Sequence, residues 1–411
     1  MSRYTPRVQE LILDDEISLK VLQSLWFRTT LLLPNLKRLD WIYVGYTEIT
    51  LIRLLLSPSL VHLYAWLNNG DHPSIIGFLE CYHILCPNLE SLHFSHLGCF
   101  PHVTTTVSRA ISRSPHLKTL LCTSIDETAL MCLASSRHLE TLQAGLEDHQ
   151  PDDLRRLAAY YGNPGHPPFE NLRTIKLHFR DLSSIIPCLR SHSQPFECIS
   201  FDLDMAATHE VLCEFFIALG SATRRRTLQR IHLSMEASEE QPMPLQAVDF
   251  QVLSLLMNFN LHEFDVDLLN PITLTDDELA HLIQAWPDLE MFYLNKFGWG
   301  YHSTSDIPTL KGLLLVIERC PKLCDLGICV DARRVPSLSG AESSICNRAI
   351  RTLLLADSPI QQSVVERVAQ FLLHHFPLLG QIHQMSDNRA MWNSVGAMLG
   401  NRRGERSRVK P

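Results

Sequence analysis

Short clusters of apolar residues recur along most of the chain. Each cluster has one apolar residue, two spacers, a second apolar residue, one spacer and a third, as in PNLKRLDW from Pro34 and PDLEMFYL from Pro287. About twelve clusters lie between Leu36 and Ile350 at a mean interval of about 28 residues, within the range of leucine-rich repeats. Because apolar residues alternate with spacers at the end of each cluster, each cluster predicts a short strand with one buried face.

The segments between these clusters have the spacing of helices. Capping boxes, in which two side chains satisfy each other's backbone amides, are predicted at Thr275 with Glu278 and at Ser363 with Glu366. Prolines such as Pro287 follow the helical runs and cannot continue them. The repeating unit is therefore a helix, a proline-containing turn, a short strand and a loop.

Units of this kind cannot bury their apolar faces alone, and stacking them makes a continuous core. We therefore predict an α/β leucine-rich-repeat solenoid, a horseshoe with parallel strands on the concave face and helices on the convex face. Three regions are expected: an N-terminal capping strand and helix over 1–33, an array of irregular repeats over 34–383, and a C-terminal extension with a basic tail over 384–411.

Composition limits the class of protein. With 45% hydrophobic and 19% charged residues and a net charge of -8, the chain is too apolar to be disordered. No apolar run approaches the roughly 20 residues that cross a bilayer, and the N-terminus lacks the apolar stretch of a secretory signal. The 12 cysteines lie mostly beside aliphatic residues, which is typical of reduced, buried thiols. We expect a cytoplasmic or nuclear protein with no membrane partner.

Sequence signatures of catalysis are missing. The chain contains no GxxxxGK[ST], GxSxG or HExxH motif. Two groups lack the partners of a zinc site and are interpreted as core or near-core residues: Cys81, His83 and Cys86, and Cys320, Cys324 and Cys329. We therefore expect a non-enzymatic protein with no catalytic residues, metal or cofactor.

Candidate binding residues lie where strand side chains point away from the core. His62, Tyr64 and Trp66 predict an aromatic cluster, and aromatic residues dominate binding hot spots. Glu263, Asp265 and Asp267, with Asp202 two strands away, predict an acidic patch suited to a basic partner segment. The full set of predicted concave-face residues is His62, Tyr64, Trp66, His93, Asp202, Glu263, Asp265, Asp267 and Tyr293. The alternative for both patches is a solvated surface or aromatic residues that cover a neighbouring turn.

Loops provide further candidates. Trp299 and Tyr301 lie between glycines in a long loop and are predicted loop contacts; the alternative, which we favour, is that Trp299 folds back onto the array edge. The basic tail from Gly400 is either a nuclear-import signal or a solubilising end. Without a basic face interleaved with aromatic residues, we expect no nucleic-acid partner.

The strand clusters and helix-ending prolines resemble the leucine-rich-repeat region of fungal F-box proteins, over roughly residues 6 to 383. That family usually has Asn or Cys eight residues after the first apolar position, and here only Asn68 clearly matches. The resemblance implies a substrate-recognition protein of an SCF-type ubiquitin ligase, in which other subunits transfer ubiquitin. The F-box module itself is not found. Either it was lost or the sequence begins downstream of the true start, and a cullin-ligase adaptor is a partner only if an F-box lies upstream.

Two other functions stay open. One is a stand-alone leucine-rich-repeat scaffold or inhibitor of the ribonuclease-inhibitor kind. The other is a GTPase-activating leucine-rich-repeat protein, for which a loop arginine such as Arg225 would act as a finger on the transferred phosphate. The sequence does not identify the target protein.

Overall fold

The computed structural model describes most of the chain. The described residues are 7–14, 16–24, 31–42, 48–67, 72–95, 101–146, 168–191, 195–223, 227–235, 246–296, 298–299, 306–338, 340, 342–384 and 388–408. They form two compact units: Met1–Arg180 with Gln194–Phe196, and Asp181–Ser193 with Glu197–Pro411. We call these the first unit and the second unit.

The first unit contains parallel strands that pair in chain order. These strands are β1 (Glu10–Leu13), β2 (Arg38–Trp41), β3 (His62–Trp66), β4 (Ser91–Ser95), β5 (Thr119–Ser124), β6 (Thr141–Gly145) and β7 (Thr174–Phe179). Its helical segments are α1 (Glu16–Ser24), η2 (Glu48–Leu54), α2 (Pro73–Leu85), α3 (Pro101–Ser112) and α4 (Glu127–Ala134). The predicted N-terminal strand and helix are β1 and α1.

The second unit repeats the same arrangement, again with parallel strands in chain order. Its strands are β8 (Cys198–Leu203), β9 (Arg230–Met235), β10 (Glu263–Asp267), β11 (Met291–Leu294), β12 (Asp325–Gly327), β13 (Thr352–Leu354) and β14 (Gln381–His383). Its helical segments are η3 (Leu182–Ser184), α6 (Ile186–Ser191), α7 (His209–Ala222), α8 (Phe250–Ser254), α9 (Asp276–Gln284), α10 (Leu310–Arg319), η4 (Glu342–Ser344), η5 (Gln362–Val364), α11 (Val365–His375) and α12 (Arg389–Arg408).

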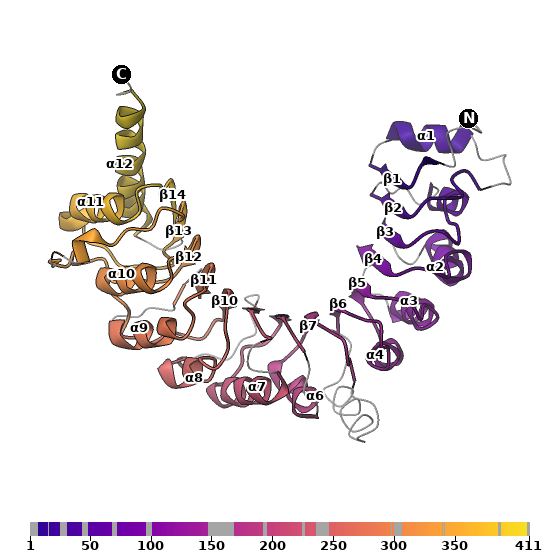
Figure 1. Cartoon of the computed structure of the whole chain (residues 1–411), viewed down its shortest axis with the longest axis horizontal. Coiled ribbons are helices and arrows are strands. Elements are labelled where there is room, and N and C mark those ends of the chain that lie inside the picture. The colour runs from indigo at the N-terminus through magenta and orange to yellow at the C-terminus, as the bar shows by residue number, and fades with distance from the viewer. Residues whose placement is uncertain are drawn as a thin grey trace. The chain divides into compact units, whose positions relative to one another are not determined.

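Each unit is an α/β structure with the strands on one side and the helices on the other (Figure 1). The core lies between them, and the predicted repeat explains it: every predicted first apolar position is buried. These positions are Leu36, Leu60, Leu89, Leu117, Leu139, Leu172, Phe196, Leu228, Leu261, Leu289, Leu323 and Ile350. Equivalent residues of successive repeats also pair, as Leu63 does with Leu92. The parallel arrangement follows because each repeat returns the chain to the same edge through a helix.

Helix caps match the sequence at one of the two predicted places. Thr275 Oγ1 accepts a hydrogen bond from the Glu278 amide, and Glu278 Oε2 accepts one from the Thr275 amide, which makes the predicted capping box. The second prediction, at Ser363, is wrong. Ser363 lies within η5, so α11 begins only at Val365 and has no side-chain cap.

Buried asparagines connect successive turns of the second unit. Asn295, which has a φ of 43°, accepts a hydrogen bond from the Leu268 amide at 2.8 Å and donates one to the Asn270 carbonyl at 2.8 Å. Asn270 in turn donates to the Ala207 carbonyl at 3.0 Å. Asn68, the residue that matches the Asn position of the resembled family, lies outside the described residues. The structure therefore shows such connections at positions that the regular repeat pattern does not predict.

The C-terminal extension contains α12, which packs against α11 and β14. Trp392, Val395 and Leu399 are buried, and Trp392 Nε1 donates to the Ser358 carbonyl at 3.0 Å. These apolar residues lie on one side of the helix, so α12 covers the last repeat. Among the described helices, none is both long enough and apolar enough to cross a membrane.

Candidate partner-binding site

The strand face of the second unit carries an ionic network. Pairing of β8 to β11 places Ser200, His232, Asp265 and Tyr293 side by side in one row. In the next row Asp202, Ser234 and Asp267 lie together. Since side chains alternate along a strand, both rows point away from the buried leucines. We call His232, Glu263, Asp265, Asp267, Tyr293 and Lys296 the ionic network.

Lys296 is the centre of this network, and the sequence analysis missed it. Its Nζ donates to Asp265 Oδ1 at 2.9 Å and to Oδ2 at 2.8 Å, and each side chain is only 18% exposed. His232 lies between two carboxylates, with Nε2 3.2 Å from Glu263 and Nδ1 3.8 Å from Asp265. The predicted acidic patch is therefore partly neutralised within the chain, because Lys296, in the loop after β11, reaches Asp265 on the strand face.

The two central carboxyl groups of the network differ in pKa. Burial alone would raise the pKa of Asp265, but hydrogen bonds from His232 and Lys296 outweigh it and hold the pKa below its ordinary value. Burial raises the pKa of Asp267 to about 6, and the charge of Asp265 adds to the rise while Lys296 opposes it. The carboxylate of Asp267 has neither a hydrogen bond nor an ion pair among the described residues. Asp202 differs again, because the Ser234 hydroxyl donates to it.

Tyr293, the last member of the network, lies against Gly327 of the neighbouring strand β12. A Cβ added to Gly327 would come within 2.8 Å of Tyr293 Cδ1 and 3.1 Å of Lys296 Cβ. Lys296 Nζ lies 5.1 Å from the centre of the Tyr293 ring, a cation–π distance. Burial, together with the nearby charges of Asp325 and Asp265, raises the pKa of Tyr293 to about 12. Tyr293 is therefore a neutral, positioned part of this face.

On the strand face of the first unit, β3 and β4 carry a group of aromatic side chains. Pairing of β3 with β4 places Tyr64 beside His93, whose rings meet edge to face with centroids 4.4 Å apart. Ser95 Oγ donates to the Tyr64 hydroxyl at 3.4 Å, and Trp66 pairs with Ser95 in register. His62 is exposed, whereas Tyr64, Trp66 and His93 are half-buried. The predicted cluster is thus a Tyr64–His93 pair with Trp66 beside it.

Exposed aliphatic residues extend this aromatic group. Ile12 of β1 is 56% exposed, and Ile42, directly after β2, is 40% exposed. We call Ile12, Ile42, Tyr64, Trp66 and His93 the aromatic patch. Asp40, which lies between Ile12 and Tyr64 in register, is 9% exposed and accepts hydrogen bonds from Arg38 at 2.9 to 3.2 Å. Burial lowers the pKa of His93 although Asp40 opposes the shift, so a neutral imidazole is favoured.

The loop prediction is corrected at Trp299. Its side chain is 1% exposed, with Nε1 donating to the Leu294 carbonyl at 2.6 Å, and its amide donates to Asp357 at 2.9 Å. An exposed contact at this residue is therefore wrong, and the favoured alternative, folding back onto the array, is confirmed. The physical reason is that the indole fills core space and its N–H finds a backbone acceptor. Tyr301 and Arg225 lie outside the described residues.

Cysteine and metal chemistry add no site. All described cysteines are free thiols, with Cys86, Cys320 and Cys329 buried as expected and Cys81 half-buried. Cys324 is exposed, so its assignment to the core or near-core is wrong; it precedes β12 and points outward. Burial raises the pKa of Cys86 and Cys320 to about 12, which suppresses thiolate chemistry. In the described part of the chain, no three His, Cys, Asp or Glu residues are arranged to hold a metal ion.

Comparison with known proteins provides no relative from which to assign these faces. No protein-family model matches the chain, and a search of curated proteins finds no match. The interpretation of the ionic network and the aromatic patch therefore depends on their geometry.

Proposed function

We propose that this chain is a non-enzymatic leucine-rich-repeat module that binds a target protein on its strand faces. The observation that carries the proposal is Asp267, a half-buried carboxylate without a hydrogen-bond partner in the described structure. A carboxylate in this state gains a charge-assisted hydrogen bond when a lysine or arginine of a partner reaches it. The neighbouring Asp265 does not offer the same interaction, because Lys296 already occupies it.

The aromatic patch supports the same function by a different interaction. Tyr64 and Trp66 present large rings with few rotatable bonds, and Ile12 and Ile42 add exposed apolar area. Such residues provide much of the binding free energy at protein interfaces. We further propose that the bound protein is a substrate of an SCF-type ubiquitin ligase. The support for this finer role is the resemblance of the repeats to fungal F-box proteins.

The test is an affinity pull-down from cell lysate with the 411-residue chain and two charge-reversal variants. Asp267→Lys reverses the unpaired carboxylate, while Glu318→Lys makes the same kind of change at an exposed position of α10, on the helix side of the same unit. We expect a stoichiometric partner that Asp267→Lys loses at least about tenfold and that Glu318→Lys retains. Equal capture by all three proteins would remove the ionic network from the proposal.

The same pull-down also tests the ligase role. Enrichment of the cullin adaptor by mass spectrometry would support it, whereas a stoichiometric partner without the adaptor would favour a stand-alone scaffold. The variants separate the two questions, because Asp267→Lys changes the strand face and leaves adaptor docking through another element unaffected.

A further inference from the structure

Two charged groups of opposite sign lie unpaired on the strand face of the second unit. They are the guanidinium of Arg230, the first residue of β9, and the carboxylate of Asp267, the last residue of β10. Both side chains are half-buried, and neither group makes a hydrogen bond or an ion pair within the described chain. Partial burial of a charge without a partner costs free energy, which a bound group of opposite charge recovers.

Arg230 lies between Cys198 of β8 and Glu263 of β10 in register. The Glu263 carboxylate is turned to His232 instead, with Oε2 3.2 Å from Nε2. Arg230 Nε is buried and has no hydrogen-bond partner, so a ligand would reach the outer N–H groups of the guanidinium. Two parallel N–H groups of a guanidinium match the two oxygens of a carboxylate.

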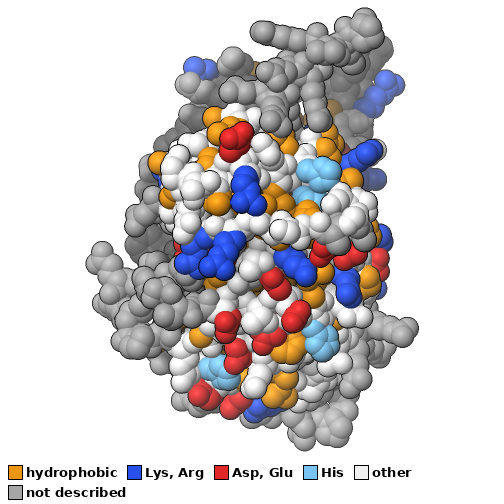
Figure 2. All heavy atoms as spheres, turned by 90° about the vertical axis from the view of Figure 1, so that its left-hand side faces the viewer, with side chains coloured by type: hydrophobic (Ala, Val, Ile, Leu, Met, Phe, Trp, Pro, Cys, Tyr) orange, Lys and Arg blue, Asp and Glu red, His pale blue; other side chains and the backbone are white. Residues whose placement is uncertain are grey.

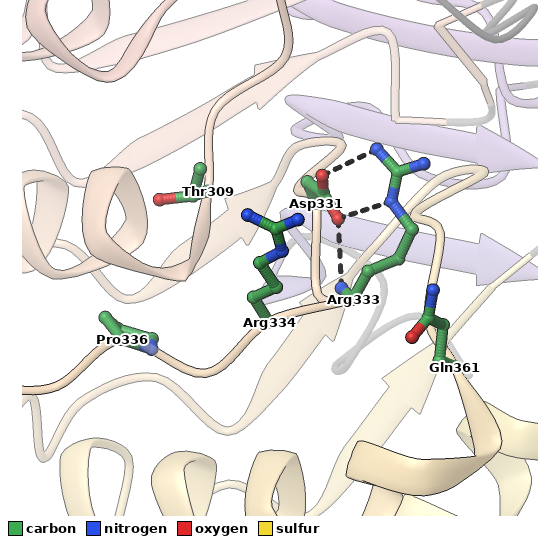
Figure 3. A pocket seen from close by; sticks show the side chains of 6 residues that line it. All are labelled: Thr309, Asp331, Arg333, Arg334, Pro336 and Gln361. Atoms are coloured by element: carbon green, nitrogen blue, oxygen red, sulfur yellow. Dashed lines mark hydrogen bonds and ion pairs between the residues drawn. The ribbon is translucent and has the colours of Figure 1, made fainter.

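Arg333, in a loop of the same unit, shows the contrasting case. It lies at a hollow lined by Thr309, Asp331 and Gln361, where its Nε donates to Asp331 Oδ1 at 2.9 Å and its Nη2 to Oδ2 at 2.7 Å (Figure 3). Figure 2 likewise shows Lys and Arg side chains next to Asp and Glu side chains on the face that it presents. The charge of Arg333 is therefore balanced within the chain, whereas that of Arg230 is not.

The spacing of Arg230 and Asp267 fits an extended segment. In register, Asp267 lies beside Ser234, which is four residues after Arg230 on β9. Four residues of a strand span roughly 13 Å. In an extended segment, residues four positions apart are separated by the same distance and point to the same side. One segment lying along β9 and β10 can therefore contact both charges.

The end of the face that holds Asp267 is negative, and its middle is neutral. Asp202 lies on the other side of Ser234 in the same row and accepts a hydrogen bond from its hydroxyl. In the middle row, Lys296 neutralises Asp265. A basic group is thus favoured at the Asp267 end, while an acidic group at the other end meets the attraction of Arg230 and the opposing charge of Glu263.

We propose that this face binds an extended segment of a partner protein with one acidic and one basic residue four positions apart. The acidic residue pairs with Arg230 and the basic residue with Asp267. The inference rests on the proposed function and adds the charge pattern of the recognised segment. A segment with basic residues alone would leave Arg230 unpaired, so the pattern gives specificity as well as affinity.

Fluorescence anisotropy of labelled peptides, titrated with the full chain in low-salt buffer, tests the spacing. The probes are nine-residue peptides of Ser, Ala and Gly with one Glu and one Lys, either four positions apart or adjacent, each in both orders. We expect one peptide with charges four apart to bind with a Kd below about 1 mM, at least about tenfold tighter than either adjacent-charge peptide. The preferred order reports the direction in which the segment runs along β9.

Three variants test the contacts. Arg230→Gln should weaken binding of the preferred peptide about tenfold, as expected for one lost charge-assisted pair. Arg367→Gln, the matched control, removes the same charge from an exposed position of α11 on the helix side and should change nothing. Glu263→Gln removes the carboxylate beside Arg230 and should tighten binding about threefold, a gain that misfolding does not produce.

The inference is overturned if no peptide binds with a Kd below about 1 mM, or if the adjacent-charge peptides bind as tightly. It is also overturned if Arg367→Gln weakens binding as much as Arg230→Gln. The pull-down separates this result from the proposed function. A partner that Asp267→Lys loses and Arg230→Gln retains would support protein binding and overturn the charge pattern, whereas loss by both variants would support the pattern.

Discussion

In the first unit, the outward-facing residues of β3 and β4 meet through their rings, as Tyr64 does with His93. In the second unit, the outward positions of β9 and β10 carry His232 and Asp265, and Lys296, from the loop after β11, pairs with Asp265. The buried positions of both units are alike, with apolar residues such as Leu63 under β3 and Phe264 under β10. The repeat pattern therefore constrains only the inward residues, whereas the outward residues differ in chemistry between the two units.

The largest effect on this comparison is expected from Asp265→Asn. The change removes the charge partner of half-buried Lys296 and of His232, so the free energy of unfolding of the second unit should fall by roughly 2 to 3 kcal/mol. Chemical denaturation followed by circular dichroism measures it. Asp202→Asn, which alters only the hydrogen bond from Ser234, is the control and should cost less than about 1 kcal/mol. Equal losses would show that Lys296 is not the centre of the network.

Gly327→Ala tests whether Tyr293 and Lys296 need the space that the absent side chain of Gly327 leaves on β12. The added methyl group would lie 2.8 Å from Tyr293 Cδ1 and 3.1 Å from Lys296 Cβ, so both residues must shift. We expect a loss of about 2 kcal/mol in the free energy of unfolding. Gly220→Ala, within α7 and with no atom within 4 Å, should instead stabilise the protein by up to about 1 kcal/mol. An unchanged free energy of unfolding for Gly327→Ala would mean that the Tyr293 ring does not lie against Gly327.

Asp267→Asn should change how stability depends on pH. The pKa of Asp267 is about 6 in the folded chain against 3.8 ordinarily, so its ionisation opposes folding once the pH rises through about 6. Below pH 3.8 the group is protonated in both states and has no effect. Relative to wild type, Asp267→Asn should therefore gain about 1 kcal/mol at pH 8, reduced by partial exposure, and almost nothing near pH 4. Urea titrations at both pH values measure this; a gain of equal size at both would contradict the ionisation argument.

Tyr64→Leu provides the smallest effect and tests the aromatic patch. Removing the edge-to-face contact with His93 should cost at most about 1 kcal/mol in the free energy of unfolding. Tyr64→Phe retains the ring and loses only the long hydrogen bond from Ser95, so its stability should match wild type. Since the contact is not ionic, raising the salt concentration should leave the difference unchanged, whereas the Asp265→Asn difference should shrink. If the Phe variant lost as much as the Leu variant, the hydroxyl and not the ring would matter.

Much of the fold could be predicted because its determinants are local. The apolar spacing after Leu36, Leu261 and Leu289 predicted buried strand positions, and the structure buries them. The capping box at Thr275 could also be predicted, because its two partners, Thr275 and Glu278, are three residues apart. At Ser363 the same local rule failed, since a turn of η5 precedes α11 and moves the helix start to Val365.

The candidate sites were less predictable because their contacts join different repeats. Asp265 was found from its place on a strand, but Lys296 lies in a loop and reaches it only through the conformation of Asn295, whose φ is 43°. Trp299 could be exposed or buried on the same sequence evidence, and its burial depends on acceptors at Leu294 and Asp357. The hollow lined by Thr309, Asp331 and Gln361 likewise needs loops from three repeats to meet.

The sequence by itself determined the parallel arrangement, the buried face of each strand and the side chains available on the outward face. These features follow from periodicity, which acts between residues a few positions apart. Only the tertiary structure decided which outward charges neutralise each other and where Trp299 lies. The physical reason is that these outcomes depend on loop conformation and on repeats stacking in register, so residues about 30 positions apart come into contact through packing.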